Sequence, residues 1–255
     1  MRFVAALIGL AASFSGCGRV DAIHGSAQDV MLDAGDGVRI AATHYPSTES
    51  KAPGVILVHM LGSDRSRWAG LAPQLQRAGY ACMAIDMRGH GDSAQQQGKT
   101  LSFRAFTTEE WMGVLRDIDA AKRGLIDRGA NAANIALAGA SIGANLALRY
   151  AAVHGDAPAV ILISPGLDYH GVAIEQAMIA YGKRPSLLMA SDGDGYSASS
   201  CARLKEVAPG HCEWRQYPGG AHGTDLLDAS DSARSQLVTW LDAVMRGKGV
   251  AADAS

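Results

Sequence analysis

IALAGASIGANLAL, residues 135–148, sets a single serine between two apolar stretches. The run before Ser141 is typical of a strand buried on both faces, and the run after it is typical of a helix. Gly139 and Gly143 flank the serine in a G-x-S-x-G pattern. A strand that turns directly into a helix brings two backbones close together, and glycine at both positions removes the clash. The pattern therefore predicts that Ser141 is exposed at a sharp turn, beside the free N–H groups of a helix start.

Buried strands and helices alternate along the chain from residue 54 onward. This order predicts an α/β fold with a mostly parallel central sheet and helices on both faces. Two earlier strands within residues 29–46, joined by a turn at 35–37, are expected to add antiparallel strands at one edge. The expected later strands are 54–60, 81–87, 134–140, 159–164, 186–191 and 212–218, and the expected helices are 67–80, 107–129, 142–155, 197–210 and 231–247. Thr108 is expected to cap the second of these helices. Ligands of such sheets lie beyond the carboxyl ends of the strands.

Length and composition favour one domain. The chain has 255 residues and a formal net charge of −2, with acidic and basic residues mixed along it. We predict a single domain over residues 30–248 and a disordered tail over 249–255. The mixed charge argues against a nucleic-acid partner. No metal-ligand spacing is present, and we predict no cofactor.

The N-terminus predicts export. One arginine precedes an apolar stretch of secretory-signal length, so residues 1–16 are interpreted as a signal peptide and 17–29 as a linker. FSGC, residues 14–17, resembles the lipobox of bacterial lipoproteins, although Phe14 stands where leucine is usual. Lipidation of Cys17 predicts a membrane-anchored protein facing the periplasm or cell surface, attached only through its lipid. The alternative is ordinary cleavage, which leaves Cys17 a plain thiol on a soluble periplasmic protein.

The other cysteines are consistent with export. Cys82 lies in an apolar run and is expected to be a small core residue. Cys201 and Cys212 enclose an expected helix and are able to pair in an oxidising compartment. Whether they pair is left open by the sequence.

The G-x-S-x-G turn, together with four further segments, resembles the α/β-hydrolase family over residues 30–245. The four segments are VILVHMLGSDRSRW, AIDMRGHGDS, MASDGD and GGAHG. The resemblance implies a Ser–Asp–His triad in that chain order, with Ser141 as nucleophile and His222 as base. Asp194 is the preferred acid, Asp192 is the second choice, and Asp168 is the third. Whichever of these carboxylates is not the acid is expected to shape a turn.

The remaining histidines receive structural interpretations. In the family, the position of His59 shapes the loop that binds the oxyanion, and His90 is expected to be a structural loop residue. The other five are expected at the solvated surface: His24, His44, His154, His170 and His211.

The resemblance also implies an oxyanion hole. One donor is the N–H of Ile142, directly after the nucleophile, and the other is the N–H of Leu61. The sequence departs from its relatives here, because Met60 stands where glycine is usual. The connection from Pro165 to Pro185 is long enough for one short helix and too short for a lid domain, so we expect a minimal cap and an open site.

These observations predict a serine hydrolase that cleaves small-molecule carboxylic esters, with a preference for short acyl chains, through an acyl-enzyme. A peptidase or amidase of the same fold is the alternative within enzymes. A non-catalytic surface lipoprotein is the alternative outside them, although the chain retains every triad residue. The sequence does not define the oligomeric state.

Overall fold

The computed structural model describes residues 25–247. The predictions for the signal peptide, Cys17, most of the linker and the C-terminal tail lie outside these residues. His24 lies outside them as well.

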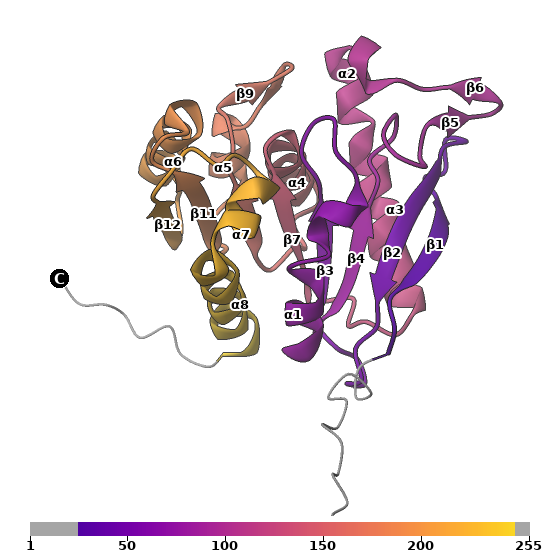
Figure 1. The fold of residues 1–255 in the computed structure, drawn as a ribbon, viewed down its shortest axis with the longest axis horizontal. Helices are drawn as coiled ribbons and strands as arrows, with labels where there is room; N and C mark the ends of the chain where they lie inside the picture. The colour runs from indigo at the N-terminus through magenta and orange to yellow at the C-terminus, as the bar shows by residue number, and fades with distance from the viewer. Residues whose placement is uncertain (1–24, 248–255) are drawn as a thin grey trace, which may run out of the picture.

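Residues 25–247 form an eight-stranded central sheet (Figure 1). Its order in space is β1-β2-β4-β3-β7-β8-β11-β12. The first two pairings, β1 with β2 and β2 with β4, are antiparallel, and all others are parallel. The mostly parallel sheet with an antiparallel edge is therefore confirmed. The strands are β1 (Gln28–Asp33), β2 (Arg39–Tyr45), β3 (Gly54–Val58), β4 (Ala81–Ile85), β7 (Ile135–Ala140), β8 (Val160–Ile163), β11 (Ser186–Ser191) and β12 (Cys212–Tyr217).

Helices cover both faces of this sheet, as expected. The main helices are α1 (Ala72–Arg77), α3 (Val114–Asp127), α4 (Ile142–His154), α6 (Gly195–Val207) and α8 (Asp231–Arg246), with a 3-10 turn at Arg65–Trp68. Shorter helices are α2 (Thr108–Met112), α5 (Glu175–Tyr181) and α7 (Thr224–Ala229), and a second 3-10 turn spans Phe103–Ala105. Two small hairpins were not expected: β5 (Gln95–Gln96) with β6 (Lys99–Thr100), and β9 (Asp168–Tyr169) with β10 (Val172–Ala173).

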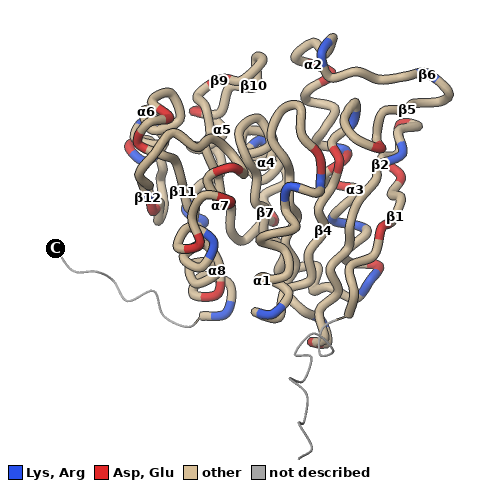
Figure 2. The backbone as a smooth tube through the Cα atoms, in the orientation of Figure 1, with Lys and Arg blue, Asp and Glu red and all other residues tan. Residues whose placement is uncertain are grey.

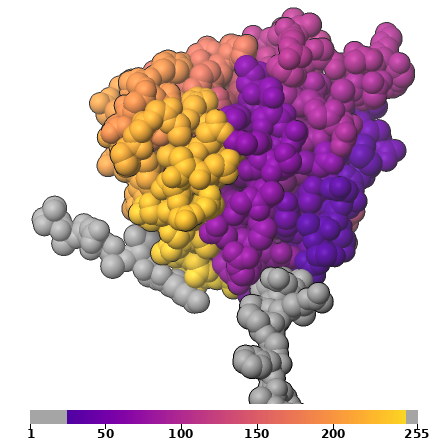
Figure 3. Space-filling view, in the orientation of Figure 1, coloured from indigo at the N-terminus to yellow at the C-terminus, as the bar shows by residue number. Residues whose placement is uncertain are grey.

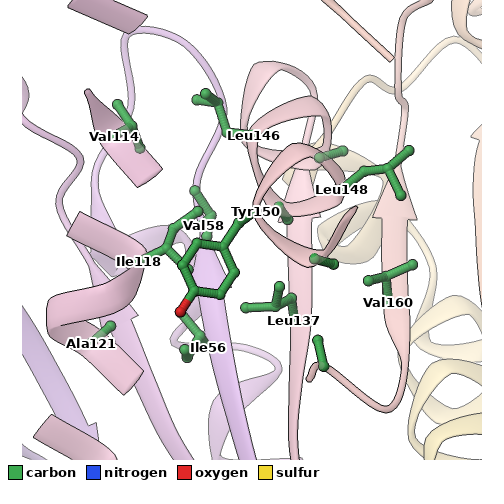
Figure 4. Close-up of a cluster of buried hydrophobic side chains, with 14 of the residues drawn as sticks. Ile56, Val58, Val114, Ile118, Ala121, Leu137, Leu146, Leu148, Tyr150 and Val160 are labelled. Atoms are coloured by element: carbon green, nitrogen blue, oxygen red, sulfur yellow. The ribbon is translucent and has the colours of Figure 1, made fainter. Parts of the chain in front are cut away.

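The core consists of two apolar layers, one on each face of the sheet. Successive residues of a strand point to opposite faces, so Ile56 and Val58 of β3 enter the layer beneath α3 and α4. Val55 and Leu57 enter the layer beneath α1 and α8. Figure 4 shows the first layer, in which Tyr150 of α4 lies among aliphatic side chains from the sheet and from α3. Central strands buried on both faces explain the continuous apolar runs of the sequence.

Charged residues are absent from the central strands of the sheet, although Asp86, Arg88 and Asp117 are buried elsewhere. Figure 2 shows acidic and basic positions interspersed around the fold, while β3, β4 and β7 carry no charge. Figure 3 shows the C-terminal segment packed beside the early part of the chain. Arg67 joins the two segments through ion pairs with Asp225 and, at 2.9 Å, with Asp228. Within residues 25–247 there is no helix with the length and apolarity needed to cross a membrane.

The helix expected over residues 107–129 is capped and divided differently. Thr107, and not Thr108, is the N-cap, because its side chain accepts from the Glu110 N–H while Glu110 accepts from the Thr107 N–H. Gly113 then separates α2 from α3. The Arg88 guanidinium lies next to Gly113. It binds Asp117 of α3 with Nε at 2.9 Å and Nη2 at 2.7 Å.

The structure also bears on the expected roles of the cysteines and of the connection from Pro165 to Pro185. Cys82, Cys201 and Cys212 are all free thiols in the structure, so no Cys201–Cys212 bridge is formed. The connection from Pro165 to Pro185 holds one short helix, α5, as expected, and also the β9–β10 hairpin. The cap is therefore minimal.

Candidate active site

Ser141 lies at the junction of β7 and α4 in a strained backbone conformation. Its φ is +54° and its ψ is −124°, a backbone conformation that residues other than glycine rarely adopt. A Cβ atom at Gly139 would overlap the backbone of Gly143, and one at Gly143 would overlap the carbonyl groups of Val58 and His59. The two glycines thus let the helix start against the sheet, and this contact holds Ser141 in its strained turn.

This contact makes a prediction about stability. Gly143→Ala is expected to lower the free energy of unfolding by more than about 2 kcal/mol, because the clash involves backbone atoms that cannot rotate away. Helix propensity alone favours alanine by about 1 kcal/mol, so any net loss reports the clash. Chemical denaturation of both proteins measures the difference. Gly70→Ala is the matched control, because its Cβ would meet only ordinary contacts at 3.7 Å and beyond. Equal stability of the two variants would contradict the prediction.

His222 and Asp194 complete a hydrogen-bonded chain that begins at Ser141. His222 follows β12, and its Nε2 lies 2.8 Å from the Ser141 Oγ. Its Nδ1 lies 2.7 Å from Oδ2 of Asp194, the residue directly before α6. With Nδ1 carrying the proton, Nε2 is an acceptor and the serine hydroxyl donates to it. This arrangement is able to activate a serine oxygen for nucleophilic attack.

The loop that carries His222 and the loop that carries Asp194 are hydrogen-bonded to each other. The Ser191 hydroxyl donates to the carbonyl oxygen of Ala221 at 2.7 Å, and the Gly193 N–H donates to that of Gly219 at 2.8 Å. The Gly223 N–H, next to His222, donates to the Ser164 hydroxyl at 2.9 Å. These bonds fix the position of His222 relative to Asp194.

The environment of Asp194 favours its ionised form. Burial acts to raise the pKa of this carboxyl, but hydrogen bonding to His222 and Ser197 outweighs burial and holds the pKa below its ordinary value. An ionised carboxylate keeps the proton of the neutral imidazole on Nδ1 and stabilises the imidazolium that forms when His222 accepts a proton.

The other two candidate carboxylates shape turns. Asp192 Oδ1 accepts the Gly219 N–H at 2.8 Å, and Asp168 Oδ1 accepts the Gly171 N–H at 2.7 Å. Neither carboxylate is hydrogen-bonded to His222 in the part of the chain that the structure describes. The structure therefore brings Asp194, and neither of its rivals, to the histidine.

Leu61 and Ile142 both line the pocket in front of Ser141. Among residues 25–247, neither backbone N–H has a hydrogen-bond acceptor in the protein, so both are available to a bound oxyanion. His59, which is fully buried, sits behind the Leu61 loop. Its Nδ1 donates to the Met60 carbonyl at 2.7 Å, and its Nε2 accepts the Met87 N–H at 3.0 Å. Burial lowers the pKa of His59 to about 4, which keeps the ring neutral and suited to this pair of bonds.

The glycine expected at position 60 is not needed in this backbone. In the described residues, Met60 is absent from the positions with positive φ, whereas Gly62 has a φ of +67°. The Met60 side chain contacts the start of α7, where Thr224 Oγ1 lies 3.7 Å from its sulfur. Met60 thus lines the pocket and packs against the segment that follows His222.

The pocket has a volume of about 390 Å³. Ser141 and His222 line it together with Met60, Leu61, Ile142, Tyr169 and His170. The last two come from the β9–β10 hairpin and were not identified from the sequence. His170 is exposed, as expected, and its ring also stacks on Trp111 with centroids 5.5 Å apart. His44 was also expected at the surface and is buried, at 5% exposure.

His90 has the structural role that the sequence favoured. It is buried, and its ring stacks on Phe103 with centroids 4.0 Å apart. The surrounding segment is held by the fully buried Asp86, whose Oδ1 accepts the Arg65 N–H at 2.7 Å and whose Oδ2 accepts the Asp92 N–H at 2.9 Å.

The sheet order, the strand–serine–helix turn and the histidine and aspartate that follow later strands define an α/β-hydrolase. Within that class, the chain belongs to the family described as serine aminopeptidase, S33, whose model matches residues 49–193.

Curated relatives are similar over part of the chain. An uncharacterized protein of Mycobacterium tuberculosis is 30% identical over 142 residues, which are 54% of this chain and 45% of that protein. The quorum-quenching protein AidA of Acinetobacter baumannii is 32% identical over 88 residues, 34% of this chain and 29% of its own length. The matches thus span less than half of the length of these relatives.

Solved structures share the fold over most of the chain. A dienelactone hydrolase from Anabaena variabilis has a TM-score of 0.70 at 20% identity, covering 86% of this chain and 98% of its own. The esterase PF2001 of Pyrococcus furiosus has a TM-score of 0.68 at 17% identity, covering 86% and 91%. A thermostable carboxyl esterase from Bacillus coagulans has a TM-score of 0.69 at 14% identity, covering 86% and 99%.

Proposed function

We propose that this protein is a serine hydrolase that cleaves small-molecule carboxylic esters through an acyl-enzyme. The observation that carries the proposal is the pair of short contacts on one imidazole ring: Ser141 Oγ at 2.8 Å from Nε2 and Asp194 Oδ2 at 2.7 Å from Nδ1 of His222.

The reaction follows from this geometry in two halves. The Ser141 oxygen attacks the ester carbonyl carbon while His222 Nε2 takes the hydroxyl proton, and Asp194 stabilises the resulting imidazolium. The negative charge on the former carbonyl oxygen is held by the N–H groups of Leu61 and Ile142. His222 then returns the proton to the leaving alcohol. In the second half, a water molecule attacks the acyl carbon while His222 takes its proton. His222 then returns this proton to the Ser141 oxygen as the acyl–oxygen bond breaks, which releases the acid and restores the free serine.

The pocket supports a preference for short acyl chains. Each methylene removed from water contributes about 0.8 kcal/mol, and a pocket with a minimal cap covers few of them. We expect kcat/KM to be greatest between acetyl and about hexanoyl esters. A series of p-nitrophenyl esters of increasing acyl length measures this, with labelling by a fluorophosphonate as the independent test for an activated serine. A maximum at palmitoyl would contradict the short-chain preference, and a protein that neither labels nor hydrolyses any ester would contradict the proposal itself.

The family description makes a peptidase the alternative. An aminopeptidase has to recognise a free α-ammonium group, for which a carboxylate is the natural partner. None of the seven residues that line the pocket carries a carboxylate. The two functions are separated by comparing p-nitrophenyl acetate with aminoacyl p-nitroanilides on the same preparation. Greater kcat/KM on the anilides would favour the peptidase.

We also propose export and lipid anchoring, supported by the N-terminal sequence alone. Acylation of Cys17 is expected to send the mature protein into the detergent phase, and Cys17→Ala is expected to abolish that partitioning. The intact mass of membrane-extracted protein measures the added acyl chains. A mass that corresponds to simple cleavage would contradict anchoring and leave the soluble periplasmic alternative.

A further inference from the structure

The β9–β10 hairpin places two ring side chains over the pocket. Tyr169 and His170 are consecutive, and both line the space in front of Ser141. The two-residue loop of this hairpin is formed by His170, with φ +54°, and Gly171, with φ +79°. Positive φ at both loop residues is the geometry of a type I′ turn, which gives a tight and well-defined hairpin.

The base of the hairpin is fixed from α4, the helix that follows Ser141. Asn145 is fully buried, and its Nδ2 donates to the carbonyl oxygens of Gly166 and Val172, both at 2.8 Å. Its Oδ1 accepts the Gly166 N–H at 3.2 Å. One buried amide thus ties β10 and the segment that leads into β9 to the helix that follows the nucleophile.

Two other helices, α6 and α2, hold the hairpin in place through further hydrogen bonds. On the α6 side, the Tyr196 hydroxyl lies 3.0 Å from both the N and the O of Asp168, and the Ser200 hydroxyl accepts the Leu167 N–H at 3.1 Å. On the α2 side, the Thr108 hydroxyl donates to the His170 carbonyl at 3.3 Å. A hairpin held from three helices presents its side chains in one arrangement, which lowers the entropy lost when a substrate contacts them.

The rings themselves are supported by other rings. His170 stacks on Trp111, which is 1% exposed, at an interplanar angle of 30°. Tyr169 lies edge-on to Tyr196 at 5.6 Å and to His222 at 6.3 Å between ring centroids. A Cβ atom at Gly166 would come within 2.6 Å of the rings of both tyrosines, so this glycine makes room for their arrangement.

Resting on the proposed ester hydrolysis, we propose that this hairpin is a rigid specificity wall and that the preferred substrates carry a flat aromatic ring next to the ester. Met60, Leu61 and Ile142 also line the pocket, so a ring bound there is able to contact aliphatic or thioether groups as well as the two hairpin rings. Ring–ring contacts and sulfur–ring contacts both favour an aromatic group over a saturated ring of similar area. No residue that lines the pocket carries a permanent charge, so the ring is expected to be uncharged.

The test compares esters that differ only in the aromaticity of one ring. Ethyl phenylacetate is paired with ethyl cyclohexylacetate, and benzyl acetate with cyclohexylmethyl acetate, to place the ring on the acyl or the alcohol side. Each kcat/KM is divided by the rate constant for alkaline hydrolysis, which removes differences in intrinsic reactivity. We expect the aromatic ester to be favoured about 3- to 10-fold in at least one pair.

The variants assign this preference to the hairpin. His170→Asn removes a ring while asparagine tolerates the positive φ, and Tyr169→Leu removes the other ring. Each is expected to lower the ratio toward one, whereas the matched control His154→Asn, on the exposed end of α4, is expected to leave it unchanged. His170 is exposed, so its variant is expected to fold even if Tyr169→Leu does not.

The outcomes separate this inference from the proposed function. Hydrolysis of both members of each pair with a ratio near one overturns the aromatic wall and leaves the esterase intact. A preference that survives both hairpin variants also overturns it, because the ring would then bind elsewhere. Loss of the preference in the hairpin variants, with ethyl acetate still hydrolysed, supports the inference. Absence of hydrolysis of every ester overturns both proposals.

Discussion

Replacing Ser141 by alanine is expected to reduce kcat for ester hydrolysis by at least about 10³-fold, because the members of a triad act as a unit and the remaining residues cannot form an acyl-enzyme. The change removes only the oxygen that lies 2.8 Å from His222. The fold is expected to survive, since alanine has the same Cβ as serine and experiences the same backbone strain. Initial rates on p-nitrophenyl acetate, with a thermal unfolding curve for each protein, measure both effects.

Ser141→Gly is the companion variant. It also removes the hydroxyl, so it is expected to be equally inactive. Glycine accepts a φ of +54° without the strain of about 1–3 kcal/mol that other residues carry there, while its greater unfolded-state entropy opposes this by about 0.5–1 kcal/mol. A higher melting temperature than that of the alanine variant is therefore expected. Retention of most of the activity in either variant would remove Ser141 from the mechanism.

The central sheet was predictable because its strands are buried on both faces. Residues 54–58, 81–85 and 135–140 are continuous apolar or small runs separated by helical segments, and this order leaves few topologies. The grouping of Ser141, Asp194 and His222 in space was predictable for a related reason. Each follows a strand of the parallel sheet, so the topology brings Ser141, Asp194 and His222 to the same edge.

The hairpins and the walls of the pocket were not predictable in the same way. β9 and β10 have two residues each, too few to display an alternating pattern. The side of the pocket that they form depends on three helices distant in sequence, through Asn145, Tyr196 and Thr108. The local sequence signal of this tight turn is the His170-Gly171 pair, and a His-Gly pair is a weak signal.

Other errors came from signals that were present but incorrectly weighed. Thr107 and Glu110 have the spacing of a capping box, which identifies Thr107 as the N-cap without a structure. His44 was assigned to the surface although it lies in a strand pattern. In the structure, His44 shares one face of β2 with Ile40 and Ala42, which enter the core layer beneath α3, and its side chain is buried there.

The sequence left three aspartates as candidates for the acid, and the structure places Asp194 next to His222. Replacing Asp194 gives the second large expected effect on activity. Asp194→Asn is expected to reduce kcat about 10³- to 10⁴-fold, similar to the loss known for the equivalent change in a serine protease. The asparagine amide is able to donate to Nδ1 of His222, which leaves the proton on Nε2, where it blocks acceptance from Ser141.

Asp192→Asn and Asp168→Asn are matched controls, because the asparagine oxygen still accepts the N–H of Gly219 or Gly171 and each turn is retained. Both controls are expected to stay within a few-fold of the wild type. The prediction is wrong if the Asp192 or Asp168 variant loses its activity while the Asp194 variant keeps it. In that case a different carboxylate orients His222 during the reaction, and catalysis does not use the 2.7 Å contact with Asp194.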